Sequence, residues 1–238
     1  MILLFVKLFL AHLLGDFLLQ PTAWVKDKEK RFYRSPYLYI HTLLHGILSW
    51  IIIGEVVFWK WALFLVITHG CIDLLKLLVQ KNKTKRRWFI IDQVLHLLIL
   101  LVITFFHQHQ KIVFYELDNR ALIVVTGIVL LTLPTSITIK NSISIWTPED
   151  SDKKDDSLQN AGNYIGILER LFVFFFIITG HFEAIGFLLA AKSIFRFGDL
   201  KEAKDRKLTE YVLIGTLLSF GIAMVTGFLV QYVLLQTL

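Results

Sequence analysis

Residues 88–106 read WFIIDQVLHLLILLVITFF, an apolar run that carries two ionisable side chains, Asp92 and His96. A helix needs roughly 20 mostly apolar residues to cross the hydrocarbon core of a bilayer, and this run has that length. A charged side chain near mid-membrane costs about 2.5–3.5 kcal/mol on insertion scales, so such groups need partners or a function. The run therefore predicts a transmembrane helix with polar chemistry on it.

Runs of the same kind recur along the whole chain. Two of them meet at Thr179-Gly180-His181 with almost no loop, so the expected number of crossings is about seven or eight. The first run lacks a small-residue cleavage site, which favours a membrane span over a signal peptide. The expected spans are residues 2–20, 37–55, 57–79, 88–106, 121–139, 161–180, 181–198 and 210–237.

Composition agrees with a membrane protein. The 238 residues are 55% hydrophobic and 18% charged, whereas soluble domains carry about 25% charged residues. This balance excludes an ordinary soluble protein and a disordered one. We predict an all-α, polytopic transmembrane helix bundle that forms a single integral-membrane domain over residues 1–238. Its front four-helix part would cover 1–106 and its rear part 121–238.

The basic residues give an orientation. The formal net charge is +6, and most Lys and Arg side chains lie in four alternate loops of the eight-span arrangement. Because cytoplasmic loops are enriched in Lys and Arg, these loops are expected inside and both termini outside. The positive charge thus needs no nucleic acid partner. The expected partners are membrane lipids, and the sequence leaves the oligomeric state open.

Each of the first four spans carries a pair of ionisable residues at spacing i,i+4, which puts both side chains on one helix face. Counted at 1.5 Å per residue, all the pairs lie about 6–15 Å from the predicted cytoplasmic ends, although successive helices run in opposite directions. Unrelated polar residues would not share one layer in this way. The pairs are His12 and Asp16, His41 and His45, His69 and Asp73, and Asp92 and His96.

Imidazole and carboxylate groups on adjacent helical turns are typical metal ligands. All eight residues of the four pairs are therefore candidate ligands of a divalent transition metal. Zinc is the leading candidate, and eight donors could serve one ion or two. Two alternatives remain: a proton or ion pathway, and a hydrogen-bonded network that only ties the helices together.

The rear spans carry opposite charges at a similar depth. Glu169 and Arg170 are adjacent in one span, and Lys192 lies near the end of the next. Arg170 and Lys192 could stabilise developing negative charge, and Glu169 or Asp92 could act as a general base. Alternatively, the basic groups balance the carboxylates of the front half.

These motifs resemble a bacterial family of multi-pass membrane proteins known only as a domain of unknown function. The resemblance rests on His12-x-x-Gly-Asp16-Phe-x-Leu-Gln20, His41-x-x-x-His45, His69-x-x-x-Asp73-x-x-Lys76, Asp92-Gln93-x-x-His96 and Leu168-Glu169-Arg170. No activity is established for that family. The resemblance does imply that the protein lies in the bacterial cytoplasmic (inner) membrane. The front half is similar, more weakly, to membrane-bound metal-dependent hydrolases.

The leading hypothesis is an intramembrane metal-dependent hydrolase of a lipid or lipid-linked phosphate ester. Whether the chain is an enzyme at all is left open by the residues. The alternatives are a metal-ion or proton transporter or channel, and a membrane scaffold or signalling protein with a structural metal. The outer halves of the first four spans carry few polar residues, which counts against a conduit.

Overall fold

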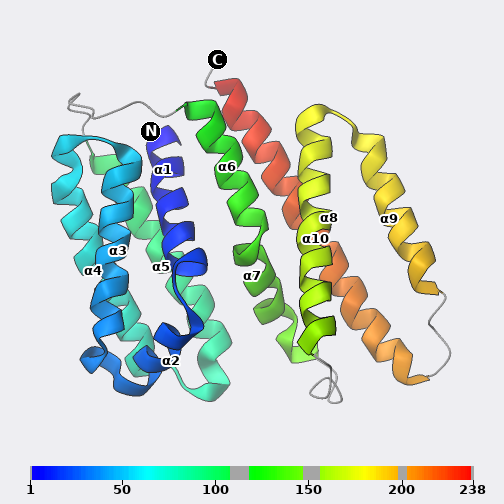
Figure 1. Ribbon diagram of the computed structural model, residues 1–238, viewed down its shortest axis with the longest axis horizontal. Helices are drawn as coiled ribbons and strands as arrows, with labels where there is room; N and C mark the ends of the chain where they lie inside the picture. The colour runs from blue at the N-terminus through cyan, green and yellow to red at the C-terminus, as the bar shows by residue number, and fades with distance from the viewer. Residues whose placement is uncertain (1, 108–117, 147–155, 198–202, 237–238) are drawn as a thin grey trace. The chain divides into compact units, whose positions relative to one another are not determined.

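The computed structural model describes residues 2–107, 118–146, 156–197 and 203–236, and the regular structure in these ranges is helical throughout (Figure 1). Six helical segments are long and apolar enough to cross a membrane, or seven if a bent pair near the N-terminus counts as one span. The predicted all-α polytopic bundle is confirmed. The described residues fall into two compact units, Met1–Thr126 and Gly127–Leu238.

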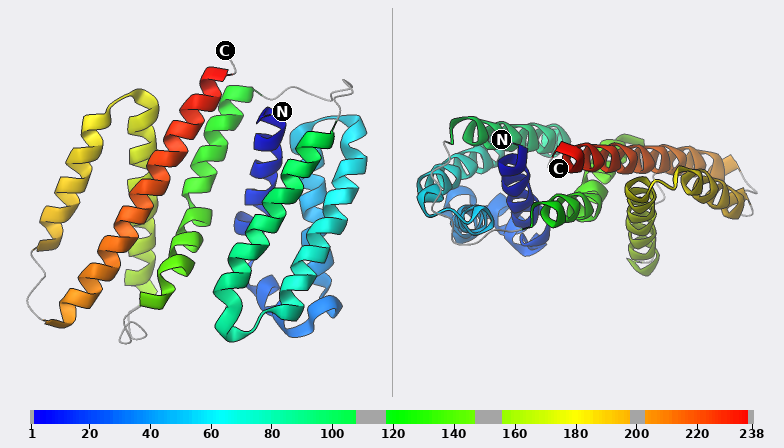
Figure 2. Two further views of the ribbon diagram at one scale, coloured as in Figure 1. Left: turned by 180° about the vertical axis from the view of Figure 1, so that it is seen from behind. Right: turned by 90° about the horizontal axis from the view of Figure 1, so that it is seen from above.

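Four helices of the first unit form a ring. They are α1 (Ile2–Leu13), α3 (Pro36–Ile53), α4 (Trp59–Val79) and α5 (Lys85–Phe106). Helix α1 packs on α3, α3 on α4, α4 on α5, and α5 on α1 again. Neighbours run in opposite directions, as in an up-down four-helix bundle (Figures 1 and 2). The pairs on the four helices therefore face one another inside the ring.

The chain bends sharply after the first span. Helix α1 continues as a π-helical turn, η1 (Leu14–Leu18), and the chain then turns by 82° into α2 (Thr22–Arg31). Pro21 precedes α2 in extended conformation, which ends the first helix and starts the second. We expected a basic loop here. The segment is instead a polar helix at the end of the unit where α1 stops (Figure 1).

The other end of this unit is apolar. Leu4 and Leu8 of α1 pack with Ile53, Phe58, Leu65 and Leu100 from the other three helices and the turn before α4, all nearly or fully buried. Gly46 lets α3 approach α4 closely, because a Cβ atom there would lie 2.4 Å from Val66 Cγ2. The polar pairs thus lie between this apolar cluster and the end covered by α2.

The second unit is built around a long helix. Helix α10 (Ala203–Gln236) packs against α8 (Asp156–Thr179) and α7 (Leu133–Ile143), and α9 (Phe182–Phe197) packs against α8. Helix α9 runs back along α8 before α10 begins (Figure 2). Its 16 residues rise about 24 Å, less than the roughly 30 Å of a bilayer core, so it is shorter than the expected span.

The fifth expected span is a broken helix. It consists of α6 (Asn119–Leu131) and α7, with a turn at Thr132 and Pro134 near the start of α7. A proline cannot donate a backbone hydrogen bond, so carbonyl groups of the preceding turn lose their helical partners. Thr135 Oγ1 donates to one of them, the Leu130 carbonyl, at 2.6 Å.

Candidate metal centre

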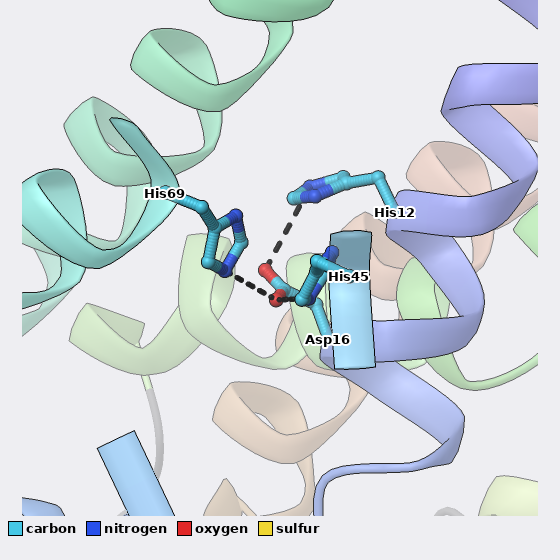
Figure 3. Close-up of side chains that lie close together, drawn as sticks. All are labelled: His12, Asp16, His45 and His69. Carbon is cyan, nitrogen blue, oxygen red and sulfur yellow. Dashed lines mark hydrogen bonds and ion pairs between the residues drawn. The ribbon is translucent and has the colours of Figure 1, made fainter. Parts of the chain in front are cut away.

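The four ionisable pairs of α1 with its π-helical turn, α3, α4 and α5 form a polar layer inside the ring, and Asp16 lies at its centre. Its Oδ1 atom is 3.0 Å from Nε2 of His45, 3.2 Å from Nε2 of His41 and 3.6 Å from Nε2 of His69. Its Oδ2 atom is 3.7 Å from Nε2 of His12. Figure 3 shows the rings of His12, His45 and His69 turned toward this one carboxylate. Nitrogen atoms from three helices therefore surround a carboxylate of one of them.

The imidazole rings also contact one another. His45 and His69 stack with ring centroids 3.8 Å apart, and His69 and His96 stack at 4.0 Å. The Nε2 atoms of His69 and His41 face each other at 3.1 Å. Two ring nitrogens at this distance must share either a proton or a cation between them. All four histidine-bearing helices thus meet in one cluster, as their i,i+4 spacing predicts.

The donor atoms form three overlapping groups, and within each group all of them lie within 4.8 Å of one another. Asp16 belongs to two groups and His69 to two, so adjacent ions could share a ligand. Imidazole nitrogen and carboxylate oxygen in this proportion suit Zn²⁺ and similar ions. The groups are His12, Asp16, His45 and His69; His41, His69 and Asp73; and Asp16, Asp92 and His96.

Several buried polar atoms of the cluster have no hydrogen-bond partner among the described residues. They are Oδ1 of Asp92, both ring nitrogens of His96, and Nδ1 of His41. Buried polar atoms are nearly always paired, because an unpaired one costs about 1–3 kcal/mol. Asp92 and His96 belong to the same ligand group, so a bound cation would satisfy both. This test of the donor set favours a metal.

The local backbone fits this arrangement. A π-helical turn is rare and occurs often at functional sites, and here it carries Asp16. Gly15, in the same turn, lies against the ring of His45, and a Cβ atom at this position would be 2.5 Å from the ring atoms Cε1 and Nε2. Only a residue without a side chain lets the turn and the imidazole approach so closely.

Helix α2 brings a lysine into the cluster, which the sequence did not predict. Lys28 Nζ donates to Asp73 Oδ2 at 2.6 Å, and both side chains are almost fully buried. The residues on either side of Lys28 hold α2 to other helices. Ser35, just before α3, donates to Asp27 at 2.6 Å, and Lys85 of α5 donates to Glu29 at 2.8 Å. Three successive residues of α2 therefore make side-chain contacts to three different parts of the ring: the start of α3, α4 and α5.

A second lysine pairs with another carboxylate of the cluster. Lys76 Nζ donates to Asp92 Oδ2 at 2.8 Å. This contact joins Lys76 of α4 to a carboxylate of the next helix, α5. Gln93 Nε2 donates to Asp16 Oδ2 at 3.0 Å, and Gln93 Oε1 lies 3.3 Å from Nε2 of His12. Lysine and glutamine thus complete the polar layer.

The predicted rear-half residues bind groups within the second unit. Arg170 donates to the carbonyls of Leu131 and Thr132 at the break between α6 and α7, and to the hydroxyls of Ser136 and Ser219. Lys192 donates to Glu169 at 2.5 Å. Arg170 therefore binds two carbonyls at the break, and one of them, Thr132 O, also accepts from the backbone N–H of Ser136. The catalytic roles expected for Glu169, Arg170 and Lys192 remain predictions.

Comparison with known families gives one result at this point. Residues 4–120 match the model of a family described as "Protein of unknown function (DUF3307)". This fits the expected resemblance to a family of unknown function, and it covers the front of the chain, where the ligand candidates and both lysines lie. The rear motifs built on Glu169 and Arg170 fall outside the match. Searches of curated proteins and of solved structures found no match.

Proposed function

We propose that the first unit is an intramembrane metal-dependent hydrolase that acts on a lipid or lipid-linked phosphate ester in the bacterial inner membrane. The observation that carries the proposal is the convergence of four histidine Nε2 atoms on the carboxylate of Asp16. Helical-bundle enzymes build their one-metal and two-metal sites from imidazole and carboxylate side chains that converge inside the bundle.

His12, Asp16, His45 and His69 would hold the first ion, which is zinc in this proposal. Asp16, Asp92 and His96 offer a second position. A divalent ion there would lower the pKa of water and polarise the phosphoryl group. The chain's own residues fix the donors: α2 and Gln93 hold the carboxylates, and the helix ring excludes bulk water.

The reaction would be hydrolysis of a phosphate ester. Water oxygen attacks phosphorus, the bond between phosphorus and the ester oxygen breaks, and the alcohol leaves. One proton of the water passes to a general base and then to the leaving oxygen, so charge and protons balance. With one ion bound, Asp92 is the candidate base, because its Oδ1 atom is buried and unpaired among the described residues. With two ions, Asp92 becomes a ligand.

A one-sided site supports an enzyme over a transporter. The polar layer is followed by the apolar cluster of Leu4, Leu8, Ile53 and Leu100. Few polar side chains are buried on that side among the described residues, chiefly Ser49, Thr104 and the His107–Glu55 pair. A conduit needs polar groups on both sides of its binding site. The side chains of Asp16 and Lys76 are 11% and 26% exposed, so the layer is more open near these two groups.

Elemental analysis of the purified protein, followed by a phosphatase assay, tests the proposal. We expect one or two equivalents of a transition metal, and release of phosphate from phosphatidic acid that stops when the metal is removed by a chelator. Metal-free wild-type protein that is folded would refute the metal site. A metal-loaded protein that hydrolyses no phosphate or acyl ester would refute the hydrolase and leave a structural metal.

A further inference from the structure

The cluster has a charge balance that depends on its two lysines. Asp16, Asp73 and Asp92 contribute three negative charges, and Lys28 and Lys76 contribute two positive ones. With neutral histidines the cluster carries one net negative charge. Other charged side chains nearby are paired with each other, since Arg31 binds Asp27 and Lys85 binds Glu29. One divalent ion would therefore leave the site with one net positive charge, and two ions with three.

An excess of positive charge inside a membrane bundle requires an anion, because an unpaired buried charge is costly. The metal-loaded site should therefore take up a negatively charged ligand. A phosphate monoester carries up to two negative charges, so it offsets the excess charge of the one-ion site and two of the three excess charges of the two-ion site. A neutral ester such as a triglyceride would leave the charge unbalanced.

The lysines are placed to contact that anion. Lys28 donates to one oxygen of Asp73, and Lys76 donates to one oxygen of Asp92. Both aspartates belong to the groups of candidate metal ligands. For Asp92 the second oxygen, Oδ1, has no partner among the described residues, so lysine and ion can bind the same carboxylate from two sides. An ammonium group carries three donors, and these contacts use one from each lysine.

We infer that Lys28 and Lys76 bind the phosphate group of the substrate beside the metal, and that the substrate is a phosphate monoester. This inference rests on the proposed function and makes it more specific. It gives the anion-binding role to two lysines of the first unit and assigns α2 to the substrate site. The same phosphate group could belong to a lipid headgroup or to a water-soluble phosphate monoester.

The test measures phosphate affinity separately from metal content. Lys28→Met, Lys28→Gln and Lys76→Met are compared with Lys30→Met, which changes an exposed lysine on the same α2 helix. Each metal-loaded protein is titrated calorimetrically with inorganic phosphate in detergent. In a second arm, each is titrated in nanodiscs containing phosphatidic acid, with phosphatidylcholine nanodiscs as the blank. Metal content and the thermal midpoint are measured for every variant.

We expect the Lys28 and Lys76 variants to keep the wild-type metal content and to bind phosphate at least tenfold more weakly, with Lys30→Met unchanged. Tighter binding of phosphatidic acid than of inorganic phosphate would identify a lipid as the source of the phosphate group, and equal binding would identify a water-soluble monoester. Unchanged phosphate affinity in folded, metal-loaded variants would overturn the inference, as would loss of the metal from them or no phosphate binding by the wild type. A wild type without metal would instead refute the proposed function.

Discussion

Asp16 Oδ1 lies 3.0 Å from Nε2 of His45, and the same carboxylate oxygen is within 3.6 Å of Nε2 in His41 and His69. The two residues come from the first and second membrane helices. Their contact joins the π-helical turn after α1 to the middle of α3. Asp16 is also shared by two ligand groups, so it should matter to metal binding more than a peripheral donor does.

Asp16→Asn should lower the metal content below one tenth of the wild-type value, because an amide is a much weaker ligand than a carboxylate and cannot neutralise a cation. Asp27→Asn is the matched control, since Asp27 lies on α2 outside every ligand group. Elemental analysis of both proteins checks the prediction. Full metal content in Asp16→Asn would mean that the carboxylate is not a ligand.

Gly15→Ala should displace the ring of His45, because the new Cβ atom would meet it at 2.5 Å. Overpacking of this kind costs about 1–3 kcal/mol of stability. We expect metal affinity to fall at least tenfold and the thermal midpoint to fall with it. Gly186→Ala adds the same methyl group where nothing lies within 4 Å, and it should leave both unchanged. Wild-type affinity in Gly15→Ala would show that His45 is not held by this turn.

Arg170→Met should destabilise the second unit. The substitution removes the donors that now reach Leu131 O, Thr132 O and two serine hydroxyls. The hydrogen bond to Leu131 O is buried, and a buried acceptor left unpaired costs about 1–3 kcal/mol. The thermal midpoint in detergent should fall by at least about 3 °C, with Arg120→Met, an exposed arginine, unchanged. Metal content should stay at the wild-type value. If Arg170→Met kept its thermal midpoint but no longer hydrolysed the phosphate ester, the result would support the catalytic role predicted for Arg170.

Proteoliposomes should not take up metal ions through the chain. The side chains of the apolar cluster around Leu8 and Ile103 are hydrophobic, and hydrophobic side chains cannot replace the hydration shell of an ion. A fluorescent zinc indicator trapped inside liposomes checks this, with an ionophore as the positive control. Rapid uptake that disappears in His45→Ala and His69→Ala would identify a transporter.

The polar layer could be predicted from the sequence because two simple rules apply to it. Residues at i,i+4 share a helix face, and helices in a bilayer have a known rise, so Asp92 and His96 can be set at the same depth as His69 without knowing any contact. The apolar runs likewise predict the helices, because a chain that crosses the bilayer core must satisfy its backbone hydrogen bonds internally and a helix does so within one segment.

The contacts of Lys28 and Lys76 could not be predicted in the same way. Lys28 lies in a polar segment that looks like a loop, and only the 82° bend after the first helix brings it back under the bundle. Lys76 binds Asp92 because α4 and α5 are antiparallel neighbours, and the order of helices around a ring is not encoded in hydropathy. Arg170 was expected to face an anion, but the break at Pro134 supplies backbone carbonyls for it.

The most direct test of the central claim is the metal content of the folded, purified protein, compared with a His41→Ala/His45→Ala double variant. A metal centre predicts at least one equivalent of a transition metal in the wild type and less than one tenth of that in the double variant. His181→Ala, a change at an exposed histidine, should keep the full amount. No bound transition metal in the wild type, or equal amounts in wild type and double variant, would contradict the metal centre.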